Sequence, residues 1–414
     1  MASTQRLGST APSTLRPLRE TTAPDRSTAT LPTSPSSQAR NTSRELSTFE
    51  PSRVATRPQT NDPSDDTVAV LDTFTQPVVV TEKSHGEMVQ NVLMANSSVT
   101  KDQVRRVPYT DSRTERTDLD GSIEDKATNF LLATTDGLKT VRDDPGKIRV
   151  VNQSMGQSKL DLTLSIWSDK MPDRKAGKAA EDKALMDLAA ELKLPPDRMA
   201  ELQKMDRKER RHAVFQALAD KVDSVLDGSA AFKQARADHA QVVEQLGQKG
   251  IVVVVAAGNE GEYVKRMEKA GFETDADFPD SALFHESPTL IVVGASTGKE
   301  RMAKFSTPSN YVSVAADGTK VEVASGRKAD GTSFAAPQVS ALIAELSAKG
   351  YSPEQIRGFL KSAAKDTKAP SNLEGDGIID MKKARERIRS MPDLTTEQPK
   401  QTPLELKLPV FVRP

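Results

Sequence analysis

Short, almost purely apolar runs constrain the fold of this chain more than any other feature of its sequence. Residues 251–257 read IVVVVAA and residues 290–296 read LIVVGAS, with β-branched side chains dominating both runs. VAVLD from Val68, VVVT from Val78 and IRVVNQSMG from Ile148 have the same character. Runs of this kind are typical of strands that are covered on both faces, because they lack alternation with polar residues. We therefore expect a buried, parallel sheet.

Helical patterns separate these runs. In HGEMVQNVLMAN, which opens at His85, the apolar residues fall at helical spacing, and residues 123–139 also have a helical pattern. From about 170 to 248, Ala, Leu, Lys, Glu and Arg predominate, which predicts three or four helices. The alternation predicts an α/β fold with a doubly wound, mostly parallel sheet, helices on both faces and a helix-rich insertion.

The two ends of the chain differ from its middle. Residues 1–66 are rich in Ser, Thr and Pro without apolar periodicity, so we expect a disordered leader. Residues 391–414 are Pro- and Thr-rich and form a predicted tail, whose apolar end LPVFVRP could pack on the body. One domain is expected over 67–390, with the insertion at about 170–248.

Composition excludes several classes of partner. Lys plus Arg and Asp plus Glu are 58 each, so net charge favours neither nucleic acid nor an acidic membrane surface as a partner. No apolar run approaches the ~20 residues that span a bilayer, and the N-terminus lacks the apolar core of a secretory signal. There is no cysteine, which leaves the redox compartment open. The expected location is cytoplasmic, or outside the cell after export without a cleavable secretory signal.

Ser333 is the candidate nucleophile. It lies in DGTSFAAPQV, a Gly-containing turn that leads directly into an apolar helix. A hydroxyl at a helix N-terminus is exposed and favours developing negative charge nearby. A serine at this position is more commonly a helix cap, so the interpretation depends on finding a base and an acid elsewhere.

His85 is the best candidate for that base among four histidines. His212 and His239 fall in the charged helical region and are expected on solvated helix faces, and His285 lies in a polar loop. His85 follows a strand that ends in Asp72, and the carboxyl end of a parallel strand is where catalytic groups gather in open α/β sheets. A carboxylate can hold an imidazole in the tautomer that accepts a proton.

Asn259, in the turn AAGNEG after the run 251–257, offers a carboxamide donor for an oxyanion. The alternative is a turn residue in the left-handed region.

Four strings together resemble the subtilisin-like serine peptidases, or subtilases: VAVLDT, HGEMV, AAGNEG and GTSFAAPQV. They occur in the order Asp, His, Asn, Ser, which is the order of the triad in subtilisin. The resemblance implies a serine endopeptidase with Asp72, His85 and Ser333 as its triad and Asn259 as its oxyanion donor. It further implies substrate-binding residues in two segments: Ser154, Met155 and Gly156 along extended substrate, and Ala256, Ala257 and Gly258 along the primary specificity pocket.

Three departures from the family pattern concern specificity and control. Phe74 stands where the family usually has Gly, the interval from Asp72 to His85 is short, and the helical block at about 170–248 is longer than the family norm. The leader has no periodic core for a folded prodomain, so control is expected from a separate inhibitor protein, from the inserted helices or from compartment.

Alternatives stay open at this point. The chain could be a catalytically silent subtilase fold that binds peptides or a partner, a helical interaction protein, or an esterase or other acyl transferase with the same triad. The expected partner is a protein or peptide substrate, and the chemistry needs no cofactor or metal. Calcium binding cannot be read from the acidic loops, which lack regular ligand spacing.

Overall fold

The computed structural model describes residues 67–74, 83–111, 113–298 and 300–395, all within one compact unit, Gln59–Pro414. The predicted leader, the predicted strand from Val78 and the apolar C-terminal end lie outside the described residues.

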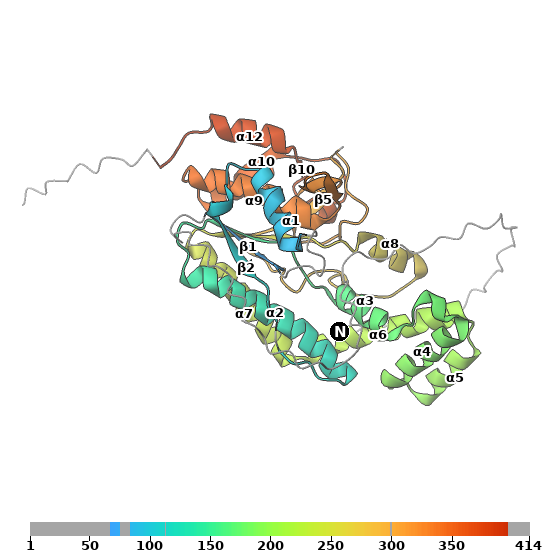
Figure 1. Ribbon diagram of the computed structural model, residues 1–414. Helices are drawn as coiled ribbons and strands as arrows, with labels where there is room; N and C mark the ends of the chain where they lie inside the picture. Colours follow the sequence, from blue (N-terminus) through green and yellow to red (C-terminus); the bar gives the residue numbers. More distant parts are fainter. Residues whose placement is uncertain (1–66, 75–82, 112, 299, 396–414) are drawn as a thin grey trace, which may run out of the picture. The chain divides into compact units, whose positions relative to one another are not determined.

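A parallel sheet forms the centre of this unit (Figure 1). Within the described residues its strand order is β2-β1-β3-β4-β5-β6-β10-β9, and only β9 runs antiparallel, to β10. The strands are β1 (Val68–Asp72), β2 (Val104–Pro108), β3 (Val150–Gln153), β4 (Val252–Ala256), β5 (Leu290–Ser296), β6 (Val312–Asp317), β9 (Ala364–Lys365) and β10 (Ile378–Ile379). A separate hairpin consists of β7 (Val321–Ala324) and β8 (Arg327–Ala329).

Helices cover both faces of the sheet, which confirms the predicted doubly wound architecture (Figure 1). The first apolar layer contains α2 (Leu119–Asp143), α3 (Lys159–Lys170), α6 (Arg207–Gly228) and α7 (Ala230–Gln248). The second contains α1 (His85–Ala95), α9 (Thr332–Ala348), α10 (Pro353–Ala363) and α12 (Met381–Ser390). The remaining helices are α4 (Lys178–Glu191), α5 (Pro196–Lys204), α8 (Gly261–Ala270) and α11 (Ser371–Glu374).

Strand β4 explains why these runs lack polar residues. Val253 and Val255 point into the first layer, whereas Val252 and Val254 point into the second. Successive side chains of a strand face opposite sides of the sheet, so a strand covered on both sides is apolar at every position. All of β4 is buried.

Local sequence sets the helix starts that matter for the site. Ser84 caps α1, because its side chain accepts from the Glu87 backbone while the Glu87 carboxylate accepts from the Ser84 backbone. His85 is therefore the first residue of α1. Gly331 precedes α9 and places Ser333 in the first turn of that helix.

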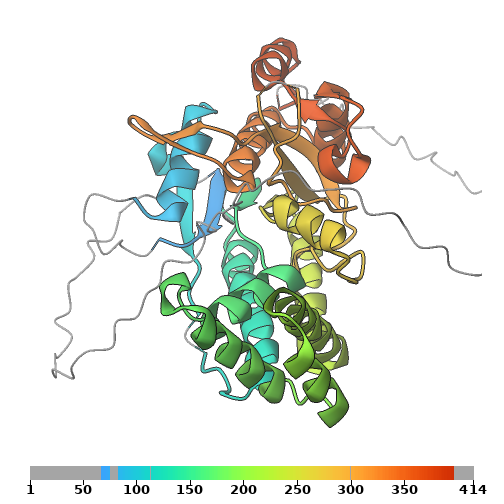
Figure 2. The same cartoon turned by 90° about the vertical axis from the view of Figure 1, so that its right-hand side faces the viewer.

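Four of the helices, α4 to α7, lie in the region predicted to be helical, at 170–248. They have different roles. Helix α7 packs on α2 and on β4 and so covers the sheet, whereas α4 and α5 pack on α6. Figure 2 shows α4, α5 and α6 gathered away from the sheet.

The expectation for His239 was wrong. Its side chain is 1% exposed, not solvated, and its ring lies 6.0 Å from that of His285. On α7 it belongs to the buried face of Phe232, Ala235, Val242 and Leu246. Burial, with smaller contributions from electrostatic repulsion by His285 and Arg236, lowers the pKa of His239 to about 3.

Within the described residues, no helix combines the length and apolarity that crossing a bilayer requires.

Candidate active site

Asp72 and His85 form a hydrogen-bonded pair at the carboxyl end of β1. His85 Nδ1 lies 2.7 Å from Asp72 Oδ1, which also accepts from the Thr73 backbone N–H at 2.7 Å. The Asp72 side chain is fully buried, while the His85 side chain is 35% exposed. The carboxylate therefore holds one ring nitrogen and leaves the other, Nε2, at the surface.

The carboxylate changes the proton affinity of the imidazole. Burial alone would lower the pKa of His85, but the hydrogen bond to Asp72 and its negative charge outweigh burial, and the pKa is raised above its ordinary value. This is the electrostatic setting of a base whose protonated form is stabilised.

Phe74, a departure from the family pattern, supports this pair from the side. Its ring fills the space where a side chain on Gly86 would lie, with ring atoms 2.7 Å from that position. Arg106 lies over the same ring at 5.1 Å. Phe74 thus packs between the strand that ends in Asp72 and the start of α1, and Gly86 gives it room.

Ser333 meets the end of β3 through two reciprocal hydrogen bonds. Its hydroxyl donates to the Ser154 carbonyl at 3.0 Å, and the Ser154 hydroxyl donates to the Ser333 carbonyl at 2.9 Å. Behind them, Asn152 Nδ2 donates to Ser154 Oγ, and Ser340 donates to Asn152 Oδ1, both at 2.9 Å. Asn152, Ser154 and Ser340 are buried, so this network fixes the start of α9 against β3.

His85 approaches the same helix from the other side. Its ring centroid lies 5.9 Å from that of Phe334, the residue after Ser333. The hydrogen bonds of the described residues include none between His85 and Ser333, because the Ser333 hydroxyl is directed to Ser154.

Asn259 is held by the residue that precedes Ser333. Its carboxamide oxygen accepts from the Thr332 backbone N–H at 2.9 Å and from the Thr332 hydroxyl at 3.1 Å. This leaves its Nδ2 donor available, and Asn259 is exposed. A carboxamide fixed in this way can offer a donor to an oxyanion that forms at Ser333.

The two predicted substrate segments lie side by side. Strands β3 and β4 are paired as far as Gln153 and Val255, so Ser154–Met155–Gly156 and Ala256–Ala257–Gly258 continue from neighbouring strand ends. Gly258 has a φ of +103°, which an L side chain rarely adopts, and a Cβ there would lie 2.7 Å from Glu260 Oε2.

The sequence analysis did not single out Asp161 and Glu260, two carboxyl groups whose pKa values are raised by burial; we call them the acidic pair. Glu260 follows Asn259 directly in the string AAGNEG, so the sequence could have predicted that it lies near the site. Asp161 lies on α3 as the third residue of a capping box with Ser158, a pattern that indicates a helix start and nothing more.

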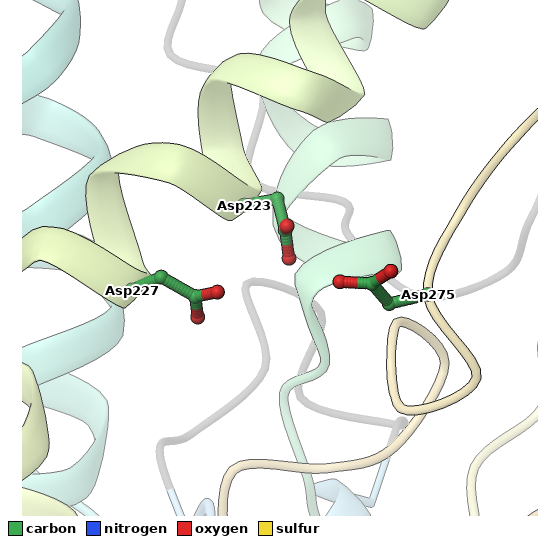
Figure 3. A group of neighbouring side chains, drawn as sticks. All are labelled: Asp223, Asp227 and Asp275. Atoms are coloured by element: carbon green, nitrogen blue, oxygen red, sulfur yellow. The ribbon is translucent and has the colours of Figure 1, made fainter. Parts of the chain in front are cut away.

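A group of carboxylates elsewhere has the spacing of a cation site. Asp223, Asp227 and Asp275 converge on one another (Figure 3). Lys159 donates to Asp223 and, at 3.1 Å, to Asp227. The ammonium group of Lys159 thus compensates the charge that a metal ion would otherwise neutralise, and the cluster acts as an ion-pair network that ties α3 to α6.

The sequence of this chain is similar to those of known proteins. The subtilase family model matches residues 127–377, well over half of the chain, including Asn259 and Ser333 but not Asp72 and His85. A thermophilic serine proteinase from Bacillus sp. (strain AK1) is 33% identical over 120 residues, which are 28% of this chain and 26% of the length of that relative.

Among solved structures, that of a lanthipeptide protease is similar to this chain with a TM-score of 0.42. The two sequences are 12% identical, and the match covers 78% of this chain and 88% of the lanthipeptide protease. The epidermin leader peptide processing serine protease of Staphylococcus aureus has a TM-score of 0.41, with 14% identity over 79% of this chain and 76% of that one. On the match of the family model, the chain belongs to the subtilase family.

Proposed function

We propose that this protein is a serine endopeptidase that hydrolyses peptide bonds in extended polypeptide substrates. The observation that carries the proposal is the hydrogen bond of 2.7 Å between His85 Nδ1 and Asp72 Oδ1, beside a helix whose first turn contains Ser333. A buried acid that is hydrogen-bonded to a half-exposed base is the arrangement that activates a serine hydroxyl, and here that hydroxyl lies in the first turn of a helix.

The proposed reaction begins when substrate occupies the Ser154–Met155–Gly156 segment. The Ser333 hydroxyl rotates from the Ser154 carbonyl toward His85 Nε2, which accepts its proton as Oγ attacks the scissile carbonyl carbon. Asp72 stabilises the imidazolium that forms. Asn259 Nδ2 and the Ser333 backbone N–H donate to the oxyanion.

Collapse of the tetrahedral intermediate breaks the C–N bond. His85 gives its proton to the departing amine, which leaves Ser333 acylated. A water molecule then attacks the ester, with His85 again accepting a proton, and releases the acid. The scheme uses side chains and water and calls for no cofactor.

A second candidate function is a catalytically silent subtilase fold that binds peptides or a partner. The hydrogen bond from the Ser333 hydroxyl to the Ser154 carbonyl favours it, because that bond directs the hydroxyl away from His85.

A fluorescent fluorophosphonate probe separates the two. We expect it to label the purified full chain at Ser333, located by peptide mass spectrometry, and to leave the Ser333→Ala and His85→Ala variants unlabelled. The second variant retains the hydroxyl and lacks the base, so it tests activation rather than mere presence of a serine. Folded wild-type protein that stays unlabelled would favour the silent fold.

A further inference from the structure

An aromatic ring holds the first turn of α1 against the end of β1. Phe74 lies two positions after Asp72, and Gly86 directly follows His85. Three ring atoms of Phe74 are 2.7–3.0 Å from the place that a Cβ on Gly86 would take, so the ring lies directly against the helix backbone. The Gly86 N–H also donates to the Thr73 carbonyl at 3.0 Å. The residues next to the proposed acid and base therefore contact each other.

Arg106 of the neighbouring strand β2 joins this ring to α1. Its guanidinium carbon lies 5.1 Å from the centroid of the Phe74 ring, within the range of a cation–π contact. Its Nε donates to Gln90 Oε1 at 2.8 Å, and its Nη1 lies 3.7 Å from Glu87 Oε1. Gln90 is buried, so loss of this donor would leave its carboxamide oxygen without a partner. One side chain of β2 thus contacts both Phe74 and the first two turns of α1.

This cluster lies where the chain departs from the subtilase pattern. Phe74 stands where the family usually has Gly, and the interval from Asp72 to His85 is short. Both departures affect the two segments that the ring joins. A glycine at position 74 would leave Gly86 and Arg106 without the ring that they contact. The contact is therefore a property of this chain, not of the family pattern.

We propose that Phe74 and Arg106 are positioning residues for the proposed base: they fix the first turn of α1 so that the His85 ring stays within hydrogen-bond reach of Asp72. The inference rests on the proposed function and deepens it. A hydrogen bond of 2.7 Å between side chains of two elements persists only while both backbones are held in place. A misplacement of about 1 Å in such a group can cost about a hundredfold in rate.

The test measures how fast the fluorophosphonate probe labels Ser333. Phe74→Ala leaves a void beside Gly86, and we expect the labelling rate to fall by about tenfold to a hundredfold. A looser bond to Asp72 also stabilises the imidazolium less, so the acid limb of the labelling rate should move to lower pH. Phe74→Leu fills most of the void and should restore most of the rate. Arg106→Met removes the donor to Gln90 and should cost about threefold to tenfold.

Gly86→Ala tests the same packing from the side of the helix. A Cβ there overlaps the Phe74 ring, so the substitution should lower the labelling rate in the wild type. In Phe74→Ala the space is empty, and the further loss should be much smaller. Losses that simply add in the double variant would show that the ring does not hold α1, and would overturn the inference.

The matched control is a second arginine over an aromatic ring, Arg387 of α12 over Phe359 of α10, at 4.8 Å. Phe359→Ala also removes a buried ring, so it should lower stability but leave the labelling rate and its pH profile unchanged. A loss in Phe359→Ala equal to that in Phe74→Ala would show a general effect of destabilisation and would overturn the inference.

A second readout needs no reaction. In Ser333→Ala protein, the His85 Nδ1–H that is hydrogen-bonded to Asp72 should give a strongly downfield proton NMR signal. We expect Phe74→Ala to abolish this signal and Phe359→Ala to keep it, and an unchanged signal in Phe74→Ala would overturn the inference.

Two outcomes remain distinguishable from these. If Phe74→Ala does not fold, Phe74→Leu and Arg106→Met decide, and wild-type rates in both would overturn the inference. A folded wild-type protein that is not labelled at Ser333 would defeat the proposed function. The NMR comparison would then still decide whether Phe74 positions His85.

Discussion

At the scale of single residues, the contact between Asp72 and His85 joins a fully buried acid to a base at the surface. Asp72 Oδ2 is also buried and has no hydrogen-bond partner within the described residues. The negative charge in this position is therefore poorly solvated, and the imidazolium form of His85 is the group that compensates it.

This arrangement gives a prediction for pH dependence. His85 must be neutral to accept a proton, and its pKa is raised, so activity should fall as the pH drops through that raised pKa. Asp72→Asn removes the charge that raises the pKa, so the acid limb of the kcat/KM profile should move to lower pH. By analogy with other triads, kcat should fall by about 10⁴-fold.

The control for that experiment is Asp317→Asn, which changes a carboxylate at the end of β6 that hydrogen-bonds to Thr319 instead of a histidine. Its pH profile should match that of the wild type. An acid limb that stays in place in Asp72→Asn would show that another group controls it.

The sequence predicted those site residues that lie in short motifs, because such a motif indicates both the type of side chain and its place at the end of a strand or the start of a helix. Asp72 and His85 are hydrogen-bonded, and Ser154, Asn259 and Ser333 gather at the start of α9. The acidic pair escaped notice because Asp161 has a complete local explanation as a capping residue. The burial that raises the pKa of Asp161 depends on how α3 packs, which no local pattern contains.

At the scale of elements, the strands predicted within the described residues are present. A short apolar run between two helices must be buried, and a strand of a central sheet buries it on both faces. Strand β2 was missed because VRRVP has two arginines and a proline. Among the strands that the structure describes, it lies at the edge of the sheet with β1 as its one neighbour, and its polar side chains reach solvent. The prediction that His239 is solvated was wrong because it followed from the charged composition of the region. The apolar residues of α7 recur at helical spacing and place His239 on the buried face.

Two glycines in helices should respond in opposite ways to Ala. At Gly261, the first residue of α8, a Cβ would lie 2.2 Å from the Ser306 carbonyl oxygen, a backbone atom that cannot yield cheaply. Gly261→Ala should lower the free energy of unfolding by about 1–3 kcal/mol. At Gly358 in α10 nothing lies within 4 Å, so Ala should raise it by about 0.5–1 kcal/mol.

Urea unfolding of the two variants measures both effects in one host. Equal stability of the two would contradict the close approach of α8 to the segment around Ser306.

At the scale of the whole unit, helices α4 to α7 differ in how closely they are connected to the sheet: α7 packs on it directly, whereas α4 and α5 pack on α6. Helix α6 packs on α2 and α3, and Lys159 ties it to the segment that follows Gly156. Trp167 on α3 packs edge-on against Phe215 on α6, with ring centroids 5.1 Å apart. Helices α4 and α5 pack on α6, and an ion pair between Lys170 and Glu191 also joins α4 to the end of α3.

We therefore expect residues 172–205 to be dispensable for the chemistry. Replacing them by a short Gly/Ser linker should give a less stable protein, since buried leucines such as Leu188 and Leu202 are lost, but one that still labels at Ser333. Extending the excision to residue 228 removes α6 and uncovers α2, and that variant should not fold. Circular dichroism and probe labelling measure the two outcomes, and loss of labelling in a folded short excision would give α4 and α5 a part in the reaction.

The reciprocal bonds between Ser154 and Ser333 also set the order of events during synthesis. The two residues are 179 positions apart, and α9 fills the face of the sheet between α1 and β3 to β6. Contacts over such separations form late, because the intervening chain must first be made and closed. On the proposed function, a chain still on the ribosome carries the proposed acid and base, Asp72 and His85, long before the proposed nucleophile Ser333. Such a chain would be unable to hydrolyse neighbouring nascent chains until its own sheet is complete.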